Sequence, residues 1–170
     1  MPETITIRPA TRDDLPALHP VIERAYRGET ARAGWTHEAD LIIEGTRTDL
    51  TTLTAIVDDP AQRLLVAIGE NGPIGCVQVI SKGDGLAYLG LLCVNPGLQD
   101  AGLGKRLVTA AEDCARDTFG ANAMEMTVID RRRELIAFYE RRGYAVSGEK
   151  RDFPIALDPP LLMDVLVKPL

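Results

Sequence analysis

The apolar and polar residues of the chain follow two periods, and their order predicts a protein built from both strands and helices. Residues 4–8 alternate between polar and apolar side chains, which is typical of an edge strand. The run over residues 87–94 is nearly all apolar and predicts a central strand buried on both faces. The expected elements, in chain order, are a strand (4–8), helical stretches (11–27, 37–45 and 49–57), strands (63–69, 74–80 and 87–94), a helix (102–117), a strand (124–128), a helix (131–142) and two strands (144–150 and 162–167). This alternation indicates the α/β class.

Glycine and proline mark the boundaries of these elements. Pro20 should kink the first helix, and Gly28 should end it. Residues 70–73, with the sequence Glu-Asn-Gly-Pro, read as a hairpin turn between two apolar strands. Gly120 and Gly143 follow the ends of two helices, where a left-handed residue commonly closes the last turn.

Length and charge narrow the class of protein. The 170 residues suggest one domain over residues 1–170, with enough chain to bury a core. The net charge of −6, without a basic stripe, argues against a nucleic-acid partner. The longest apolar runs are far shorter than the roughly 20 residues that a membrane span needs, and the start of the chain leads directly into a strand. We therefore expect a cytoplasmic protein with no membrane partner.

Three cysteines, Cys76, Cys93 and Cys114, are scattered through apolar segments. Their odd number and wide spacing suit neither a disulfide framework nor a metal site. A free cysteine in such a segment behaves as a small apolar residue. We expect no metal, and a reducing compartment.

A glycine-bearing loop between the central strand and the helix that follows carries the most specific signal. Its spacing is Gln99-x-x-Gly102-x-Gly104, and it opens the helix directly. Backbone N–H groups at a helix N-terminus attract phosphate, and glycine permits close approach. An ordinary strand-to-helix turn is the alternative interpretation. A dinucleotide fingerprint fits less well because Leu107 stands where its third glycine belongs, and no Walker lysine pair is present.

This spacing resembles the acetyl-CoA-binding signature of the GNAT superfamily of N-acetyltransferases. A second segment, residues 133–144, resembles the GNAT segment in which a helix ends in an aromatic-Tyr pair, a charged turn and Gly-Tyr. The two segments stand in the expected order, with one helix and one strand between them. The resemblance implies a GNAT-like fold, in which helices flank both faces of a central mixed β-sheet.

The resemblance also implies acetyl-CoA as cofactor and a set of residues that hold it. The expected cofactor-binding residues are Leu92, Cys93, Val94, Gln99, Asp100, Ala101, Gly102, Leu103, Gly104, Lys105, Arg132 and Tyr139. Amides from the loop would hold the pyrophosphate, and the strand would pair with the pantetheine arm. The chain departs from the family pattern twice: Asp100 adds negative charge near the pyrophosphate, and Arg132 stands where an asparagine is usual.

Acetyl transfer to an amine needs a donor for the thioester carbonyl, a proton for the leaving sulfur and a base for the amine. In the family a bulge in the central strand frees backbone amides, and the equivalent positions here are Leu92 and Cys93. Tyr139 matches the family's usual general acid, since a phenol is protonated at neutral pH; a core aromatic is the alternative. Glu38 is the base we favour, with His37, Asp130, Glu70 or a water chain as the other candidates.

The segment after the first helix is expected to line the acceptor site. Its candidate residues are Tyr26, Trp35, Glu38 and Arg47. The indole of Trp35 could line the site or clamp the loop onto the core. Arg47 could hold a substrate carboxylate or pair with a nearby aspartate.

These features predict an N-acetyltransferase that moves an acetyl group from acetyl-CoA to a primary amine by direct attack in a V-shaped cleft of the sheet. The acceptor would be a small molecule, an amino acid or a peptide. The alternative is a non-catalytic acyl-CoA-binding sensor or interaction module. The apolar run over residues 161–167 could contribute an edge strand to a homodimer.

Overall fold

The computed structural model describes residues 4–26, 48–95, 102–152 and 161–170. Within these ranges the element order is the expected one. The elements are β1 (Thr6–Pro9), a short 3-10 turn η1 (Arg12–Asp14), α1 (Leu15–Tyr26), α2 (Leu50–Asp58), β2 (Gln62–Gly69), β3 (Gly72–Gly83), β4 (Leu86–Val94), α3 (Leu103–Phe119), β5 (Ala123–Ile129), α4 (Arg133–Arg141), β6 (Ala145–Asp152) and β7 (Leu162–Pro169). The helix expected over residues 37–45 lies outside the described residues. None of the described helices is long and apolar enough to cross a membrane.

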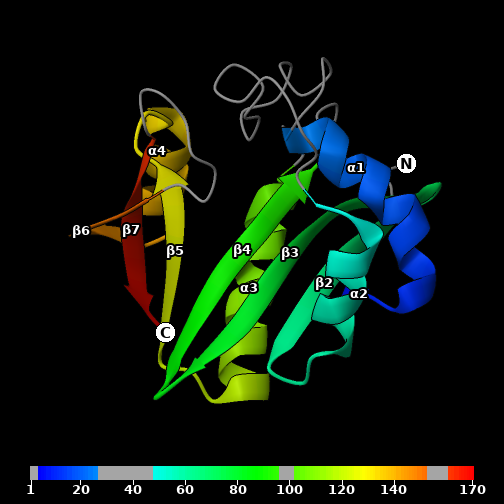
Figure 1. Cartoon of the computed structure of the whole chain (residues 1–170), viewed down its shortest axis with the longest axis horizontal. Coiled ribbons are helices and arrows are strands. Elements are labelled where there is room, and N and C mark those ends of the chain that lie inside the picture. Colours follow the sequence, from blue (N-terminus) through cyan, green and yellow to red (C-terminus); the bar gives the residue numbers. More distant parts are fainter. Residues whose placement is uncertain (1–3, 27–47, 96–101, 153–160) are drawn as a thin grey trace.

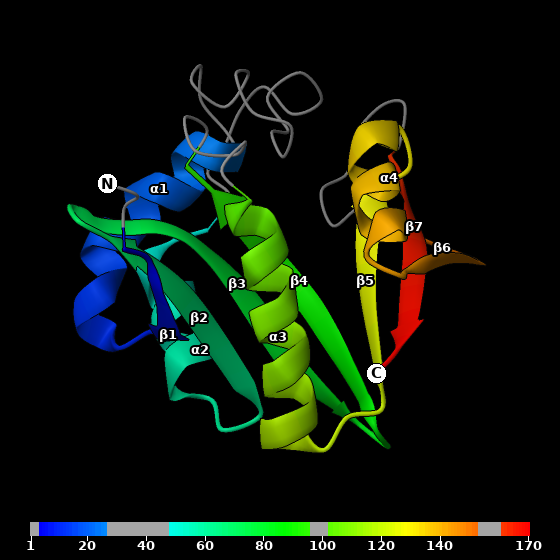
Figure 2. The same ribbon diagram turned by 180° about the vertical axis from the view of Figure 1, so that it is seen from behind.

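The strands form one mixed sheet of seven strands in the order β1-β2-β3-β4-β5-β7-β6. Only β4 and β5 run parallel; the other neighbours are antiparallel. Helices α1 and α2 cover one face (Figure 1), and α3 and α4 lie on the other (Figure 2). This arrangement confirms the predicted α/β class and the mixed sheet flanked on both faces.

Two apolar cores follow from this layering. One lies under α3 and α4 and includes Leu107 and Met126, while the other lies under α1 and α2 and includes Ile22 and Leu53. Strand β4 holds the middle of the sheet and contributes to both cores, as its apolar run predicted.

The strand expected to provide a dimer edge does not lie at an edge. Strand β7 pairs with β5 on one side and with β6 on the other, so β6 is the exposed end of the sheet. The prediction for residues 161–167 is therefore wrong. The prediction failed because the last strand of the chain does not lie at the end of the sheet but inserts between two earlier strands.

Local residues set the helix boundaries. The side chain of Asp49 accepts a hydrogen bond from the backbone N–H of Thr52 (2.7 Å) and caps α2. Helix α1 continues through Pro20. Gly120 (φ +64°) and Gly143 (φ +99°) follow α3 and α4 in the left-handed conformation, as their positions predicted.

A β-bulge interrupts β4. Cys76 of β3 faces Cys93 and Gln78 faces Gly90, so Leu91 and Leu92 together oppose one residue of β3. Leu91 has φ of +50°, a left-handed conformation that costs a non-glycine residue about 1–2 kcal/mol. The bulge thus lies one residue earlier than the expected Leu92 and Cys93.

The parallel strands β4 and β5 separate soon after they meet. They pair only at Leu86–Ala123, Ala87–Met124 and Tyr88–Glu125, although β4 continues to Val94 and β5 to Ile129. Beyond Tyr88 the β5-facing backbone of β4 has no partner strand among the described residues. Figure 1 shows the two strands diverging toward their carboxyl ends.

Gly75 of β3 lies close to the backbone at the end of β4, and its substitution tests how closely the two strands pack there. A Cβ atom at Gly75 would lie 2.6 Å from the backbone oxygen of Cys93. We expect Gly75→Ala to lower the free energy of unfolding by about 1–3 kcal/mol, because the rigid backbone next to the bulge must move. Chemical denaturation measures the loss.

Gly90→Ala is the matched control on the same strand pair. Its Cβ would meet only side-chain atoms of Gln78 and Tyr88, at 3.1 Å. We expect a smaller loss there. Equal losses for the two variants would mean that the backbone beside the bulge adapts freely.

Candidate functional site

The start of helix α3 offers unpaired backbone donors. Gly102 is the N-cap residue (φ +78°) and provides no side-chain cap, and the first helical bond runs from Arg106 N–H to the Gly102 carbonyl (3.2 Å). The N–H groups of Leu103, Gly104 and Lys105 therefore precede the helical ladder. The first turn contains no acidic residue.

The surroundings of Gly102 are open among the described residues. A Cβ atom built on Gly102 would have no described atom within 4 Å. The side chain of Leu103 is buried in the core, which leaves its backbone as the functional part. Gln99, Asp100 and Ala101, the remaining residues of the expected loop, lie outside the described residues.

The bulged end of β4 presents backbone rather than side chains. The side chains of Leu92 and Val94 are buried in the core beneath α3, and that of Cys93 in the core beneath α1. The hydroxyl of Tyr26 donates a hydrogen bond to the carbonyl oxygen of Leu92. Tyr26, expected in the acceptor site, is thus attached to the bulge.

Tyr139 lies on α4 and is only 4 % exposed. Its ring makes edge-to-face contacts with Phe138 (5.2 Å between centroids) and Tyr144 (5.9 Å). Within the described part of the chain its hydroxyl has no hydrogen-bond partner. A buried hydroxyl without a hydrogen bond costs about 1–3 kcal/mol.

Burial also fixes the protonation state of Tyr139. Desolvation raises the pKa of its phenol well above the ordinary value, and the positive charge of Arg132 opposes this only partly. The phenol is therefore a proton donor at neutral pH. Arg132 is the N-cap residue of α4, the helix that carries Tyr139.

Tyr144 provides a contrast. Its hydroxyl donates to Glu112 (2.9 Å), which is also paired with Lys168 (3.0 Å). Both the ring and the polar atom of Tyr144 are used inside the protein. Tyr139 and Tyr144 lie in the same core, and they differ in that the hydroxyl of Tyr144 has a side-chain partner.

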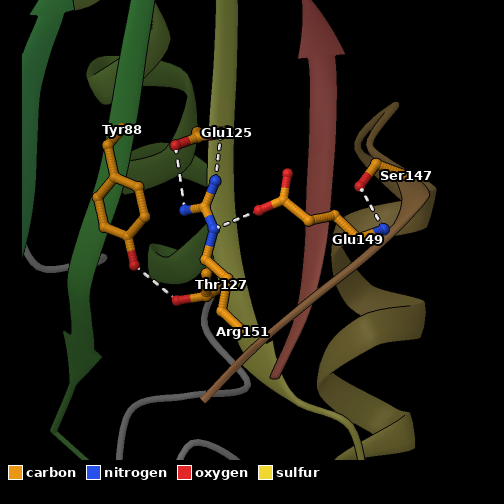
Figure 3. Close-up of polar contacts among 6 residues, drawn as sticks. All are labelled: Tyr88, Glu125, Thr127, Ser147, Glu149 and Arg151. Atoms are coloured by element: carbon orange, nitrogen blue, oxygen red, sulfur yellow. Dashed lines mark hydrogen bonds and ion pairs between the residues drawn. The ribbon is translucent and has the colours of Figure 1, made fainter. Parts of the chain in front are cut away.

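The structure adds a hydroxyl pair that the sequence analysis missed. Tyr88, in the last residue pair of β4 with β5, lies 2.6 Å from Thr127 between the two hydroxyl oxygens (Figure 3). The pair joins β4 to β5 where they begin to diverge. Tyr88 also adds, after burial, to the raised pKa of Tyr139. A polar residue inside the apolar run over residues 87–94 was the available signal.

A chain of ion pairs lies beside this hydroxyl pair, and it was also missed. The two terminal nitrogens of Arg151 contact the carboxylate of Glu125 at 3.3 and 3.2 Å, and its Nε contacts Glu149 at 2.6 Å. Figure 3 shows the guanidinium between Tyr88 and Glu149. Glu125 and Thr127 alternate with apolar residues along β5, which is the pattern that could have drawn attention to this face.

The two candidate bases that the structure describes, Asp130 and Glu70, lie apart. Asp130 is paired with Lys150 (3.3 Å), and Glu70 lies in the β2–β3 turn, on the opposite side of β4 from β5. The other candidates and the acceptor residues Trp35, Glu38 and Arg47 lie outside the described residues, together with His37. Among the residues that the structure does describe, no cluster of His, Cys, Asp or Glu is suited to a metal ion.

Comparison with known proteins agrees with this geometry. The acetyltransferase (GNAT) family matches residues 22–144, which is well over half of the chain. Blasticidin-S acetyltransferase of Streptomyces morookaense is 35% identical over 79 residues, which are 46% of this chain and 57% of that protein. The match therefore spans little more than half the length of this relative.

Solved structures share the fold at low sequence identity. The ribosomal-protein-S18-alanine N-acetyltransferase from Escherichia coli has a TM-score of 0.75 at 17% identity, with 98% of this chain and 94% of that chain covered. A spermidine N-acetyltransferase from Vibrio cholerae, in complex with CoA and spermine, has a TM-score of 0.71 at 17% identity, with 96% and 94% covered. The family match and the shared fold lead to one conclusion: the chain belongs to the acetyltransferase (GNAT) family.

Proposed function

We propose that the protein is an acetyl-CoA-dependent N-acetyltransferase that acetylates a primary amine by direct attack. The observation that carries this proposal is Tyr139, a buried phenol whose hydroxyl has no hydrogen-bond partner among the described residues and whose pKa is raised in part by Tyr88, the last residue of β4 to pair with β5. The O–H of this phenol therefore has no acceptor among the described residues and could donate to a bound substrate or cofactor. Membership of the GNAT family supplies the reaction in which that donor is needed.

The first turn of α3 would hold the pyrophosphate of CoA. The amides of Gly102, Leu103, Gly104 and Lys105 lead this helix, and the positive end of its dipole favours the phosphate charge. Gln99, Asp100 and Ala101 complete the proposed loop. Arg132 would add a positive charge on the side of α4.

The edge of β4 that does not pair with β5 beyond Tyr88 would hold the acetyl-bearing arm. When bound, acetyl-CoA supplies an acetyl group activated as a thioester. The backbone at Leu92, Cys93 and Val94 would pair with the arm and donate a hydrogen bond to the carbonyl oxygen as negative charge develops there. Tyr26 would keep the bulge in place through its bond to the Leu92 carbonyl.

Tyr139 would give its proton to the departing sulfur as the new N–C bond forms and the C–S bond breaks. The amine must lose a proton before it attacks, and Glu38 remains our proposed base. Trp35 and Arg47 remain proposed acceptor contacts. The named relatives act on spermidine, on an alanine of ribosomal protein S18 and on blasticidin S, so the family fold supports several amine acceptors.

The three cysteines form no disulfide, and two of them are buried. This supports the proposed cytoplasmic location, where thiols stay reduced. We also propose that residues 1–170 form one domain, and that this domain folds without a disulfide.

Calorimetric titration with acetyl-CoA, CoA and adenosine diphosphate tests the proposal first. We expect micromolar binding of both CoA species and far weaker binding of the diphosphate, because the pantetheine arm pairs with β4. An amine panel with acetyl-CoA then follows product formation. If acetyl-CoA bound but no amine were acetylated, the alternative of a non-catalytic acyl-CoA-binding sensor or interaction module would be favoured. If neither CoA species bound, the cofactor assignment would be refuted.

Gly102→Glu should weaken acetyl-CoA binding by roughly 100-fold or more. The new carboxylate would occupy the open space before α3 and repel the pyrophosphate, and like charges about 4 Å apart repel by several kcal/mol near a protein surface. The same titration measures the effect. Gly120→Glu is the matched control, since Gly120 also has a positive φ and open surroundings but caps the other end of α3. Unchanged affinity in Gly102→Glu would exclude the loop as a phosphate site.

Tyr139→Phe should lower kcat by about 100- to 10,000-fold, the range expected for loss of a general acid. The ring contacts remain, so acetyl-CoA affinity should change little. Steady-state kinetics and calorimetry on the same preparation separate the two quantities.

Tyr144→Phe is its control because it removes a neighbouring buried hydroxyl. That variant should lose about 1–3 kcal/mol of stability through the lost bond to Glu112, with kcat retained. If Tyr139→Phe turned over as fast as the wild type, Tyr139 would not be the acid.

A further inference from the structure

Two hydroxyl side chains connect β4 and β5 just beyond the point where their backbones stop pairing. The last backbone pair is Tyr88 with Glu125, and the same register, continued, would place Gly90 opposite Thr127. Instead, the hydroxyl oxygens of Tyr88 and Thr127 lie 2.6 Å apart (Figure 3). The stretch beyond Tyr88, where the structure describes no pairing between β4 and β5, is called the strand gap below. The hydroxyl pair therefore bridges the narrow end of the strand gap.

The ring of Tyr88 extends along β4 toward the bulge. A Cβ atom at Gly90 would lie 3.1 Å from Cε1 of that ring and 3.1 Å from the side-chain oxygen of Gln78. Gly90 directly precedes Leu91, the first residue of the bulge. The ring therefore takes up the space beside residue 90, and the part of β4 that lies beyond the ring begins at the bulge.

Tyr88 and Tyr139 approach the same region from opposite faces of the sheet. Ala87 and Leu89 face the core beneath α3 and α4, which also contains Tyr139. Tyr88 stands between them in β4 and so points to the other face. Burial is the main cause of the raised pKa of Tyr139, and the Coulombic effect of Tyr88 adds to it. The two phenols are thus near enough for Tyr88 to affect the pKa of Tyr139.

Helix α3 fixes the direction in which the proposed cofactor arm would run. The helix begins beside the carboxyl end of β4, because Leu107 in its second turn and Val94 lie 3.3 and 3.4 Å from the Cβ position of Gly75. It ends beside the start of β4, where the N–H of Asn122 donates to the Gly85 carbonyl (2.7 Å). The pyrophosphate would therefore lie at the wide end of the strand gap (Figure 1). An arm paired with the end of β4 would carry its acyl group toward the narrow end.

We propose that Tyr88, held in place by Thr127, is the specificity-determining residue for the acyl donor and excludes acyl groups longer than acetyl. This inference rests on the proposed acetyltransferase function and adds the feature that restricts the class of thioester. The Tyr88 ring stands between the bulge, where the thioester carbonyl would bind, and the narrow end of the strand gap. Each added methylene of a longer acyl group would meet the ring, and closely packed protein tolerates such overpacking poorly.

Calorimetric titration of the full-length protein with CoA, acetyl-CoA and butanoyl-CoA, without any amine, tests the proposal in a way that needs no turnover. We expect butanoyl-CoA to bind at least about 10-fold more weakly than acetyl-CoA, the lower end of the discrimination that a pocket achieves per methylene. Equal affinity for the two thioesters, or tighter binding of butanoyl-CoA, would overturn the proposal. If neither CoA nor acetyl-CoA bound, the cofactor assignment itself would fail, and this inference with it.

Tyr88→Ala should remove the limit on acyl length. We expect its affinities for acetyl-CoA and butanoyl-CoA to agree to within about threefold, because the ring no longer blocks the added methylenes. Its affinity for CoA, which carries no acyl group, should match that of the wild type. Tyr88→Leu serves if the alanine variant does not fold, since leucine keeps an apolar side chain in the strand but is too short to reach Thr127. It should shift the ratio of the two affinities in the same direction.

Phe119→Ala is the matched control for the loss of a half-buried ring. Phe119 ends α3, and the guanidinium carbon of Arg63 lies 5.3 Å from the centroid of its ring. Arg63 belongs to β2, which β3 and β4 separate from β5, so the control lies away from the strand gap. It should keep the wild-type ratio of acetyl-CoA to butanoyl-CoA affinity. The wild-type ratio in a folded Tyr88 variant, or the same loss of discrimination in Phe119→Ala, would overturn the proposal.

Discussion

The separation of β4 from β5 is the constraint on which the rest of the site depends. A parallel pair would normally continue its hydrogen bonds along both strands, but here pairing stops at Tyr88 and Glu125. The bulge at Leu91 and Leu92 turns the end of β4 away, at the cost of a left-handed conformation for a leucine. The result, among the described strands, is an unpaired stretch of backbone in the middle of the sheet, whereas β1 and β6 are unpaired only as its outer edges.

The two cores maintain this strained arrangement. Leu91 and Cys93 lie in the core under α1, and Leu92 and Val94 lie in the core under α3. Any shift of the register by one residue would exchange these faces and expose apolar side chains. Tyr26 adds a hydrogen bond from α1 to the Leu92 carbonyl. Packing on both faces therefore pays for the strain of the bulge.

Polar groups on α4 and the neighbouring strands divide into those that the protein satisfies and those that it does not. Glu112 of α3 binds both Tyr144, which follows α4, and Lys168 of β7, and so joins these segments. Tyr139, five residues from Tyr144 in the sequence, has no such partner among the described residues. Two buried tyrosines in one core thus differ in a single respect, and that difference separates a structural hydroxyl from a proposed proton donor.

The sequence alone determined the elements, their order, the central place of β4 and the two motifs, because hydrophobic period, glycine positions and short spacings are local properties. It also led to the proposals that Gly102 belongs to a phosphate-binding loop and that Tyr139 is the general acid. The tertiary structure decided those features that depend on contacts between residues far apart in the chain. The bulge position needs the register with β3, and the place of β7 between β5 and β6 needs the whole sheet. The contacts of Tyr88 with Thr127 and of Arg151 with Glu125 join residues 39 and 26 positions apart, which no local pattern can pair.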